Sequence, residues 1–341
     1  MKEYIEKVKN NESLTMEQMK RAAEAIFNEE TPASIIEQFL RALSEKGETA
    51  DELAALAIVM KENAYSLHET PQSYLDNCGT GGDGIGSFNI STAAAFVLAA
   101  GDVYVAKHGN RKVSSLAGST DTLEELGIHA NFTHAQLKQL LDEQKLAFIF
   151  APSIHPKLKR IGRIRQKIGK PTIFNLVGPL ANPVALPTQY TGINRPEFVV
   201  EYAKVMRLLQ RERAVVVSGE QGMDEASLSG INRLAILENN QITQMTLTAE
   251  DVGLQTYPLS AIKGGNSREN AQLIHRVLQN EQGAYLDTVL LNAGIGFFAN
   301  GKTTTIQEGV HLAQQLIASG KAYEKLRAII AFSKNYEKEH A

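Results

Sequence analysis

A glycine-rich turn at residues 79–86, with the letters GTGGDGIG, is the part of the sequence best suited to chemistry. Its five glycines in eight positions carry no Cβ, so backbone N–H groups can converge on an anion. An Ala-rich stretch that opens with Ser91 and Thr92 and runs to Ala100 predicts a helix. The unpaired N–H groups and positive dipole end of that helix would face the same anion. The sequence therefore predicts a phosphate-binding turn.

Two familiar nucleotide-binding motifs do not explain this turn. Gly79, Gly81 and Gly84 match the spacing of the dinucleotide fingerprint, but the helix begins too late and no convincing strand precedes the turn. A Walker A loop is excluded because no Gly-Lys-Ser/Thr follows the glycines. Asp83 inside the turn indicates contact with a metal ion or with ribose hydroxyls, or else only a local Asx-turn.

Apolar runs alternate with helices in the chain after Pro71. Such runs are typical of buried parallel strands with helices on both faces of the sheet. The runs are residues 103–106, 147–151 and 214–217. Each is followed by a polar loop, and these loops are residues 107–111, 152–156 and 219–225. Because ligands of open α/β sheets bind outside the carboxyl ends of the strands, we expect the three loops to meet in one crevice.

Asp224 and Glu225 form an adjacent carboxylate pair in the third loop. Such a pair is typical of a solvated turn, but beside a phosphate ligand it could bind Mg²⁺, which takes one or two carboxylates plus substrate oxygens. Ser91 could add a hydroxyl ligand. Lys107 and His108 are candidates for catalysis, yet no Ser or Cys nucleophile motif or zinc motif accompanies them. We therefore expect positioning and charge stabilisation, without a covalent catalytic residue.

The first 70 residues predict four short amphipathic helices, because apolar residues recur at helical spacing. Two pairs have the spacing of a capping box, Thr15 with Gln18 and Thr49 with Glu52. Thr31 is predicted to cap the third helix, with Pro32 at its first position, and Gly47 to end it. This region is interpreted as a small helical domain or an oligomer surface.

Residues 157–170 carry seven Lys or Arg and no acid. They predict a helix over 157–168 whose basic side is either solvated or lies beside the crevice. Further along, we expect strands at 234–237 and 242–247 and helices at 268–281, 284–299, 304–319 and after Tyr323. Gly294 and Gly296 indicate close packing of the second of these helices.

Charge and composition narrow the class of protein. The net charge of −3 gives no general attraction to nucleic acid or to anionic lipid, so we expect neither as a partner. Cys78 is the only cysteine, which excludes an internal disulfide and fits a reducing compartment. The N-terminus lacks a signal-peptide core and no apolar run reaches the roughly 18 residues that span a bilayer, so we expect a cytoplasmic protein. A chain of 341 residues favours two domains.

Seven motifs together resemble the anthranilate phosphoribosyltransferase family. They are GTGGD at 79–83, SFNIST at 87–92, KHGNR at 107–111, SSxxGS at 114–119, HP at 155–156, FNxxGPLxNP at 174–183 and GMDE at 222–225. The resemblance runs along nearly the whole chain, and its specificity lies in the combination. It implies a step of tryptophan biosynthesis, in which phosphoribose passes from phosphoribosyl pyrophosphate (PRPP) to the amine of anthranilate with release of pyrophosphate, and Mg²⁺ as the cofactor.

The resemblance also implies roles for individual residues. Those implied for PRPP are Gly79, Gly82, Asp83, Ser87, Asn89, Ile90, Ser91, Thr92, Lys107, Ser115 and Ser119. Those implied for anthranilate are Gly79, His108, Asn110, Arg165 and Pro179. Those implied for the metal are Ser91, Asp224 and Glu225. Two departures from the family pattern stand out. Ser87 replaces a common Thr and keeps the hydroxyl, whereas Leu116 and Thr120 alter the serine loop.

The family resembles pyrimidine nucleoside phosphorylases in fold. The implied class is α/β, with a large, mostly parallel sheet domain that has helices on both faces, a small all-helical domain, and a homodimer formed through the helices. We expect the helical domain to comprise residues 1–70 together with about 155–187, and to provide the dimer interface and the acceptor side of the site. The α/β domain, with PRPP and metal, is expected at 71–154 and 188–341. Two alternatives remain open, a pyrimidine nucleoside phosphorylase and a non-catalytic nucleic-acid-binding relative, the latter motivated by residues 157–170.

Overall fold

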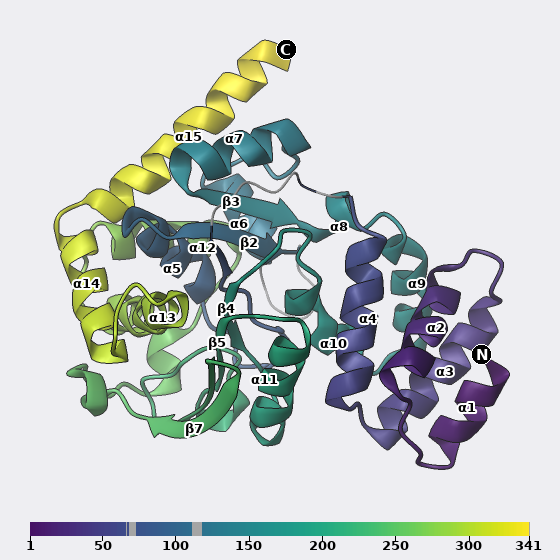
Figure 1. The fold of residues 1–341 in the computed structure, drawn as a ribbon. Coiled ribbons are helices and arrows are strands. Elements are labelled where there is room, and N and C mark those ends of the chain that lie inside the picture. The colour runs from purple at the N-terminus through teal and green to yellow at the C-terminus, as the bar shows by residue number, and fades with distance from the viewer. Residues whose placement is uncertain (66, 68–72, 111–117, 341) are drawn as a thin grey trace.

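Figure 1 shows the computed structural model, which describes residues 1–65, 67, 73–110 and 118–340. A small bundle of helices from the N-terminal end lies beside a larger part built on a β-sheet. This arrangement confirms the predicted class, a small helical domain next to a mostly parallel α/β domain. Pro71, Arg111, Ser115 and Leu116 lie outside the described residues.

The elements have the following bounds. The helices of the bundle are α1 (Lys2–Lys9), α2 (Met16–Phe27), α3 (Ala33–Lys46) and α4 (Ala50–Glu62). The strands are β1 (Tyr74–Asp76), β2 (Tyr104–Gly109), β3 (Leu146–Phe150), β4 (Thr188–Gly192), β5 (Arg213–Ser218), β6 (Asn232–Glu238) and β7 (Gln241–Leu247). The other α-helices are α5 (Ile90–Ala100), α6 (Ser119–Glu125), α7 (His134–Gln144), α8 (Ala151–Ile154), α9 (Leu158–Ile168), α10 (Phe174–Val177), α11 (Val199–Leu208), α12 (Ser267–Leu278), α13 (Ala284–Asn300), α14 (Ile306–Ala318) and α15 (Lys321–His340). Short 3-10 helices are η1 (Gly178–Ala181), η2 (Pro196–Phe198), η3 (Glu220–Gly222), η4 (Glu250–Val252) and η5 (Leu259–Ile262).

The sheet of the described residues has seven strands in the order β3-β2-β1-β4-β5-β6-β7. Strands β1 to β5 pair in parallel with one another, whereas the pairs β5 with β6 and β6 with β7 are antiparallel. The chain order reverses between β1 and β4, which is the point where open α/β sheets bind ligands. The glycine turn follows β1, and the Thr80 N–H donates to the Gly192 carbonyl at the end of β4 (2.9 Å). The turn therefore sits at the reversal point.

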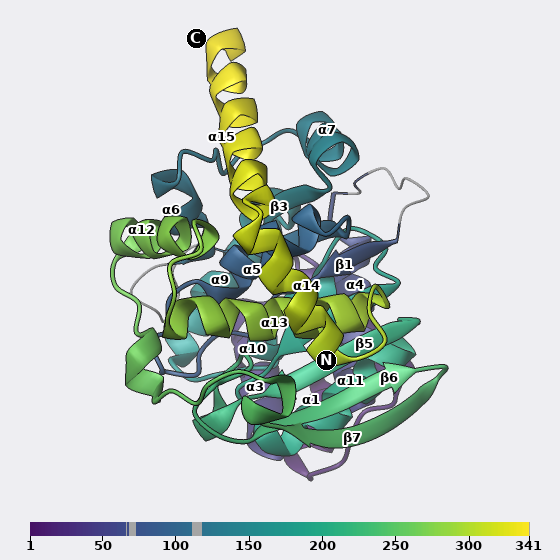
Figure 2. The ribbon, with the colours of Figure 1, turned by 90° about the vertical axis from the view of Figure 1, so that its left-hand side faces the viewer.

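Helices cover both faces of the sheet, and the inner strand β5 is accordingly apolar on both sides. Val215 and Val217 belong to the core that contains α5 and α13, whereas Ala214 and Val216 belong to the core that contains α11 and the helical bundle. Figure 2 views the molecule from the side of α13, α14 and α15. The helical bundle thus shares its core with one face of the sheet.

The helix caps and helix ends predicted for the bundle are mostly confirmed. Both predicted capping boxes form, and Gly47 ends α3 with a φ of +89°. The prediction for Thr31 is wrong, because Pro32 itself is the N-cap residue of α3 and no side chain caps this helix. The Thr31 carbonyl instead accepts a hydrogen bond from Arg160.

Helix α9 packs against the bundle although the sequence places it more than 90 residues later. Ile161, Ile164 and Ile168 are buried in the core of the bundle. Arg160 also donates to the Asn28 carbonyl (2.8 Å), so it joins α9 to the end of α2. The face of α9 that packs on the bundle is therefore apolar, although the segment 157–170 is rich in Lys and Arg.

The later elements agree with the expected ranges to within a few residues, including the hairpin of β6 and β7. The close packing predicted for α13 is confirmed, since a Cβ at Gly294 would lie 2.6 Å from Val310 of α14 and one at Gly296 would lie 2.9 Å from Leu98 of α5. The expectation that no strand precedes the glycine turn is wrong, because β1 does so with three residues. Within the described ranges, no helix is both long enough and apolar enough to cross a bilayer.

Candidate active site

The N-terminus of α5 meets the carboxyl ends of β1 and β2. The buried Lys107 ammonium of β2 donates to the Ser91 hydroxyl (3.1 Å) and to the Asn77 carbonyl (3.5 Å). Asn77 directly follows β1 and donates through Nδ2 to the Ser91 carbonyl (2.8 Å). An ammonium group beside a helix N-terminus favours the binding of an anion at this point.

The glycine turn lies against the loop that carries the acid pair. The Gly81 N–H donates to Asp224 Oδ2 (2.5 Å), and the Asp224 N–H donates to Asp83 Oδ2 (3.3 Å). Asp83 Oδ1 accepts from the Ile85 N–H (3.0 Å), which is the Asx-turn considered from the sequence. Asp83 therefore closes the local turn with one oxygen and reaches the acid loop with the other.

Two glycines make this close approach possible. A Cβ at Gly79 would lie 2.5 Å from Asp224 Oδ2 and 2.7 Å from the Asp224 carbonyl oxygen. A Cβ at Gly192, the last residue of β4, would overlap the Asp224 backbone. Gly81 and Gly82 have positive φ values of 72° and 81°, which glycine adopts without steric cost. Gly79 is thus required for packing against the acid loop, while the next glycines shape the turn.

Three carboxyl groups share this region, those of Asp83, Asp224 and Glu225. Burial raises the pKa of Asp224 well above its usual value, and repulsion from Asp83 and Glu225 raises it further. Burial also raises the pKa of Glu225 to about 7, although the charge of Lys107 and hydrogen bonds from Ser91 oppose this shift. Carboxyl groups crowded in this way fit a divalent cation, which would relieve their repulsion. Ser91, Asp224 and Glu225 are therefore candidates for binding a divalent cation, with two carboxylates and one hydroxyl, although the described residues hold no group of three or more His, Cys, Asp or Glu side chains placed to bind a metal ion.

His108 of β2 has a buried ring nitrogen that is unpaired among the described residues. Its Nδ1–H donates to the Gly178 carbonyl (3.1 Å), so Nε2 carries no hydrogen in the neutral ring. Nε2 is buried and makes no hydrogen bond to any residue that the structure describes. Burial lowers the pKa of His108 to about 3, with a smaller contribution from His155, whose ring centroid is 5.5 Å away. His108 is therefore neutral at pH 7 and offers an acceptor to a bound molecule.

Asp76 and Asn182 form hydrogen bonds that fix the end of β2, the strand that carries Lys107 and His108. Asp76 accepts from the His108 N–H (3.3 Å) and from Asn182 Nδ2 (2.8 Å), which also donates to the Ala106 carbonyl (2.7 Å). Burial raises the pKa of Asp76 to about 6, and the charge of Lys107 opposes the shift. Sequence analysis assigned no role to either residue, although Asp76 stands at the start of the glycine segment and Asn182 lies in the FNxxGPLxNP motif.

Asn292 of α13 fixes the backbone of Ala226, the residue that follows Asp224 and Glu225. Its Oδ1 accepts from the Ala226 N–H (2.9 Å) and the Tyr190 hydroxyl (2.6 Å), and its Nδ2 donates to the Ala226 carbonyl (2.9 Å). Asn292 is fully buried. Sequence analysis missed this residue, and the available signal was an amide in the middle of an otherwise apolar helix.

A cleft of about 1080 Å³ opens where α9 faces the loop after β3. Asn110, His155, Arg165 and Asn175 are among its lining residues. Arg165 donates from Nη2 to Asn175 Oδ1 (3.0 Å) and lies over the Phe174 ring at 5.7 Å. Burial lowers the pKa of Arg165 from its usual value. The cleft thus brings together two predicted anthranilate residues, Asn110 and Arg165, and His155 links it to His108.

Several predicted PRPP residues surround the start of α5. Asn89 is the N-cap residue, and its Oδ1 accepts from Thr122 (2.7 Å) and Asn270 (2.9 Å). Ile90 is buried, and the buried hydroxyl of Thr92 has no hydrogen-bond partner in the part of the chain that the structure describes. Asn89, Ile90 and Thr92 therefore flank Ser91, the residue whose hydroxyl accepts from Lys107.

Other predicted residues make contacts with other parts of the chain. Ser87 forms a β-bridge with Lys263, and Ser119 donates from its hydroxyl to the Asn110 carbonyl (3.1 Å). Pro179 is buried in η1, and its carbonyl accepts from Gln189 (2.7 Å). Ser115 lies outside the described residues, so its predicted contact is not placed.

Comparison with known proteins extends these observations. Residues 2–64 match the helical bundle domain of a glycosyl transferase family, and residues 71–323 match the a/b domain of that family. The fold and site therefore define a two-domain glycosyl transferase.

Individual relatives narrow this class. A protein of Listeria monocytogenes serotype 4b, named anthranilate phosphoribosyltransferase, is 50% identical over 334 residues, which cover 98% of each chain. The crystal structure of anthranilate phosphoribosyltransferase from Thermus thermophilus is 40% identical, with a TM-score of 0.91 over 97% of this chain and 99% of that one. The enzyme from Saccharomyces cerevisiae in complex with PRPP and Mg is 25% identical, with a TM-score of 0.88 over 98% and 97% of the two chains. The chain belongs to the anthranilate phosphoribosyltransferase family, enzymes of tryptophan biosynthesis, as its motifs implied.

Proposed function

We propose that PRPP binds where the glycine turn, the N-terminus of α5 and the acid loop meet, and that anthranilate binds in the Arg165 cleft. The observation that carries this proposal is the pair of contacts Gly81 to Asp224 and Lys107 to Ser91, which gather backbone donors, an ammonium group and carboxylates at the carboxyl ends of the strands. A site for a pyrophosphate group with its metal ion needs both hydrogen-bond donors to the phosphate oxygens and ligands for the metal. The yeast relative was crystallised with PRPP and Mg, which supports the same ligands here.

The PRPP residues act by binding and charge neutralisation. The glycine turn and α5 would offer backbone N–H groups, and Lys107 a positive charge, to the phosphates. The buried hydroxyl of Thr92, which has no partner among the described residues, supports a ligand contact at this point. The proposed set is Gly79, Gly82, Asp83, Ser87, Asn89, Ile90, Ser91, Thr92, Lys107, Ser115 and Ser119.

Ser91, Asp224 and Glu225 would hold Mg²⁺ together with oxygens of the substrate. The raised pKa values of both carboxyl groups support this assignment, because a cation would favour their charged forms. When bound, the ion would neutralise charge that grows on the departing pyrophosphate.

The acceptor side of the site holds a small aromatic acid. Arg165, fixed by Asn175, would bind the anthranilate carboxylate through a charge-assisted hydrogen bond. His108 Nε2 would accept an amine hydrogen, which orients the nitrogen lone pair toward C1 of the ribose. Gly79, Asn110 and Pro179 complete the proposed set.

The reaction then needs little proton chemistry. An arylamine attacks without first losing a proton, so a strong base is unnecessary and the neutral His108 suffices as an acceptor. The barrier lies in breaking the bond from C1 of the ribose to the pyrophosphate oxygen. Donors arranged before the reaction, at the turn and at Lys107, would stabilise the charge that develops there.

We also propose the domain boundaries expected from the sequence, with 1–70 and about 155–187 as the helical, acceptor-side domain and 71–154 and 188–341 as the PRPP and metal domain. The hydrogen bonds from Arg160 to the end of α2 support grouping α9 with the bundle. A homodimer through the helical domain and a cytoplasmic location complete the proposal.

The test is an assay of the purified chain with anthranilate, PRPP and Mg²⁺, followed by the loss of anthranilate fluorescence. Turnover that needs all three components is the expected result. Thymidine or uridine with phosphate tests the nucleoside phosphorylase alternative, and turnover of these instead would overturn the proposal. A steeply salt-dependent affinity for DNA, without turnover of anthranilate, would favour the nucleic-acid-binding alternative.

A further inference from the structure

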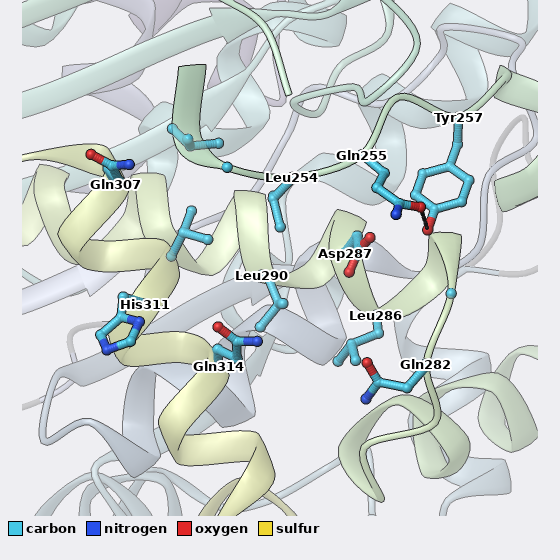
Figure 3. Close-up of a pocket in the computed structure, with 14 residues that line it drawn as sticks. Leu254, Gln255, Tyr257, Gln282, Leu286, Asp287, Leu290, Gln307, His311 and Gln314 are labelled. Carbon is cyan, nitrogen blue, oxygen red and sulfur yellow. Dashed lines mark hydrogen bonds between the residues drawn. The ribbon is translucent and has the colours of Figure 1, made fainter. Parts of the chain in front are cut away.

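A second pocket, of about 470 Å³, lies between α13, α14 and the segment that follows η4. Figure 3 shows the residues that line it. None of them lines the Arg165 cleft, and none belongs to the glycine turn or to the acid loop. The volume lies within the range of about 300 to 1000 Å³ that is typical of small-molecule sites. The pocket is therefore large enough for a ligand and separate from the candidate active site.

The pocket has an apolar floor and an amide-rich rim. Leu286 and Leu290 of α13, with Val310 of α14, are buried and form part of the floor. Four glutamines lie around the opening, namely Gln255, Gln282, Gln307 and Gln314. This lining fits a molecule with a hydrocarbon body and groups that accept or donate hydrogen bonds at its outer end.

Asp287 determines the charge of the pocket. Of the fourteen residues that line it, all in the described part of the chain, Asp287 is the only acid and none is Lys or Arg. Its half-buried carboxyl lies near the centre of the view in Figure 3, between Leu290 and Tyr257. Burial raises the pKa of Asp287, and hydrogen bonding with Tyr257 opposes the shift. His311 also lines the pocket, but no Lys or Arg does, and a half-buried carboxylate without such a partner is a strong acceptor for an ammonium group from a ligand.

We propose that this pocket binds a small organic amine, with the ammonium group on Asp287 and the hydrocarbon body on Leu286, Leu290 and Val310. The charge selects a cation, the apolar floor selects a ligand with hydrocarbon surface, and the volume limits its size. Anthranilate and PRPP are anions, so this preference is opposite to that of the candidate active site.

The test compares three probes of similar shape and different charge. 2-Phenylethylamine is a cation, 2-phenylethanol is neutral and 3-phenylpropionate is an anion at pH 7. Binding to the full chain is measured by calorimetry and by saturation-transfer NMR, without substrates, with saturating anthranilate alone, and with saturating PRPP and Mg²⁺ alone. We expect the amine to bind about 10-fold or more tightly than the alcohol and the acid, and to do so equally well when the substrates are present.

Variants assign the binding to the pocket. Asp287→Asn should weaken amine binding about 10-fold or more, whereas Glu324→Gln, which removes an exposed acid from α15, should leave it unchanged. Circular dichroism of both variants checks that the fold is kept. Three results would overturn the proposal: equal affinity for amine and alcohol, displacement of the amine by anthranilate, or no measurable amine binding. An Asp287→Asn variant that binds the amine normally would overturn it as well.

Discussion

Replacing Arg165 by Ala tests the acceptor side of the site most directly. The guanidinium lies half-buried in the cleft, is held by Asn175 at 3.0 Å and packs over Phe174. A hydrogen bond to a charged group contributes about 1.5 to 3 kcal/mol, and every 1.4 kcal/mol is a factor of about ten in affinity. Because the Arg165 side chain keeps some contact with solvent, the lower end of this energy range applies. We expect the KM for anthranilate to rise about 10-fold or more, while the KM for PRPP stays nearly constant.

The matched control is Arg163→Ala. Arg163 lies two residues earlier on α9, is exposed and does not line the cleft, so its loss removes the same charge without the contact. Each KM is measured from the loss of anthranilate fluorescence, with the other substrate at saturation. Two results would refute the reasoning. One is an equal rise in both KM values for Arg165→Ala, and the other is the same effect from Arg163→Ala.

Three further predictions concern the rest of the site. The double variant Asp224→Asn, Glu225→Gln should need at least 10-fold more Mg²⁺ for half-maximal activity, and an unchanged Mg²⁺ titration would remove these acids from the metal site. Gly79→Ala should weaken PRPP binding and Mg²⁺ activation together while the protein stays folded, because its Cβ would displace Asp224; normal PRPP affinity would contradict this. The pKa of His108 is about 3 in the folded chain and about 6.5 in the unfolded chain, so the unfolded state binds more protons between these values. The free energy of unfolding in urea should therefore fall as pH drops below about 6.5, by at most about 1.4 kcal/mol per pH unit from this residue, and less steeply in His108→Gln; equal slopes would contradict it.

The convergence of the polar loops could be predicted from the sequence because it follows from a general property of parallel sheets. Apolar runs mark the strands, and polar residues at or beyond the carboxyl ends of these runs, such as Lys107 at the end of β2 and Glu225 after β5, must then share one edge of the sheet. Helices with capping boxes were predictable for a similar reason, since Thr15 and Thr49 act on residues only three positions away.

What could not be predicted depends on contacts between distant parts of the chain. Strand β1 has three residues and becomes recognisable only through its pairing with β2 and β4. The role of Gly79 in packing against Asp224 joins residues 145 positions apart, and the local sequence shows only a flexible turn. Asp76 and Asn182 are also paired over a long separation, so their positioning of His108 has no local signature.

Helix α13 contacts the acid loop through the hydrogen bonds of Asn292 to Ala226. The same helix packs closely at Gly294 against Val310 of α14. A methyl group at Gly294 would force α13 away from α14 and would move Asn292 with it. A homologue could therefore become inactive through one substitution deep in its interior while it keeps every residue that touches either substrate. Judging whether such a homologue is a working enzyme requires checking this glycine as well as the substrate contacts.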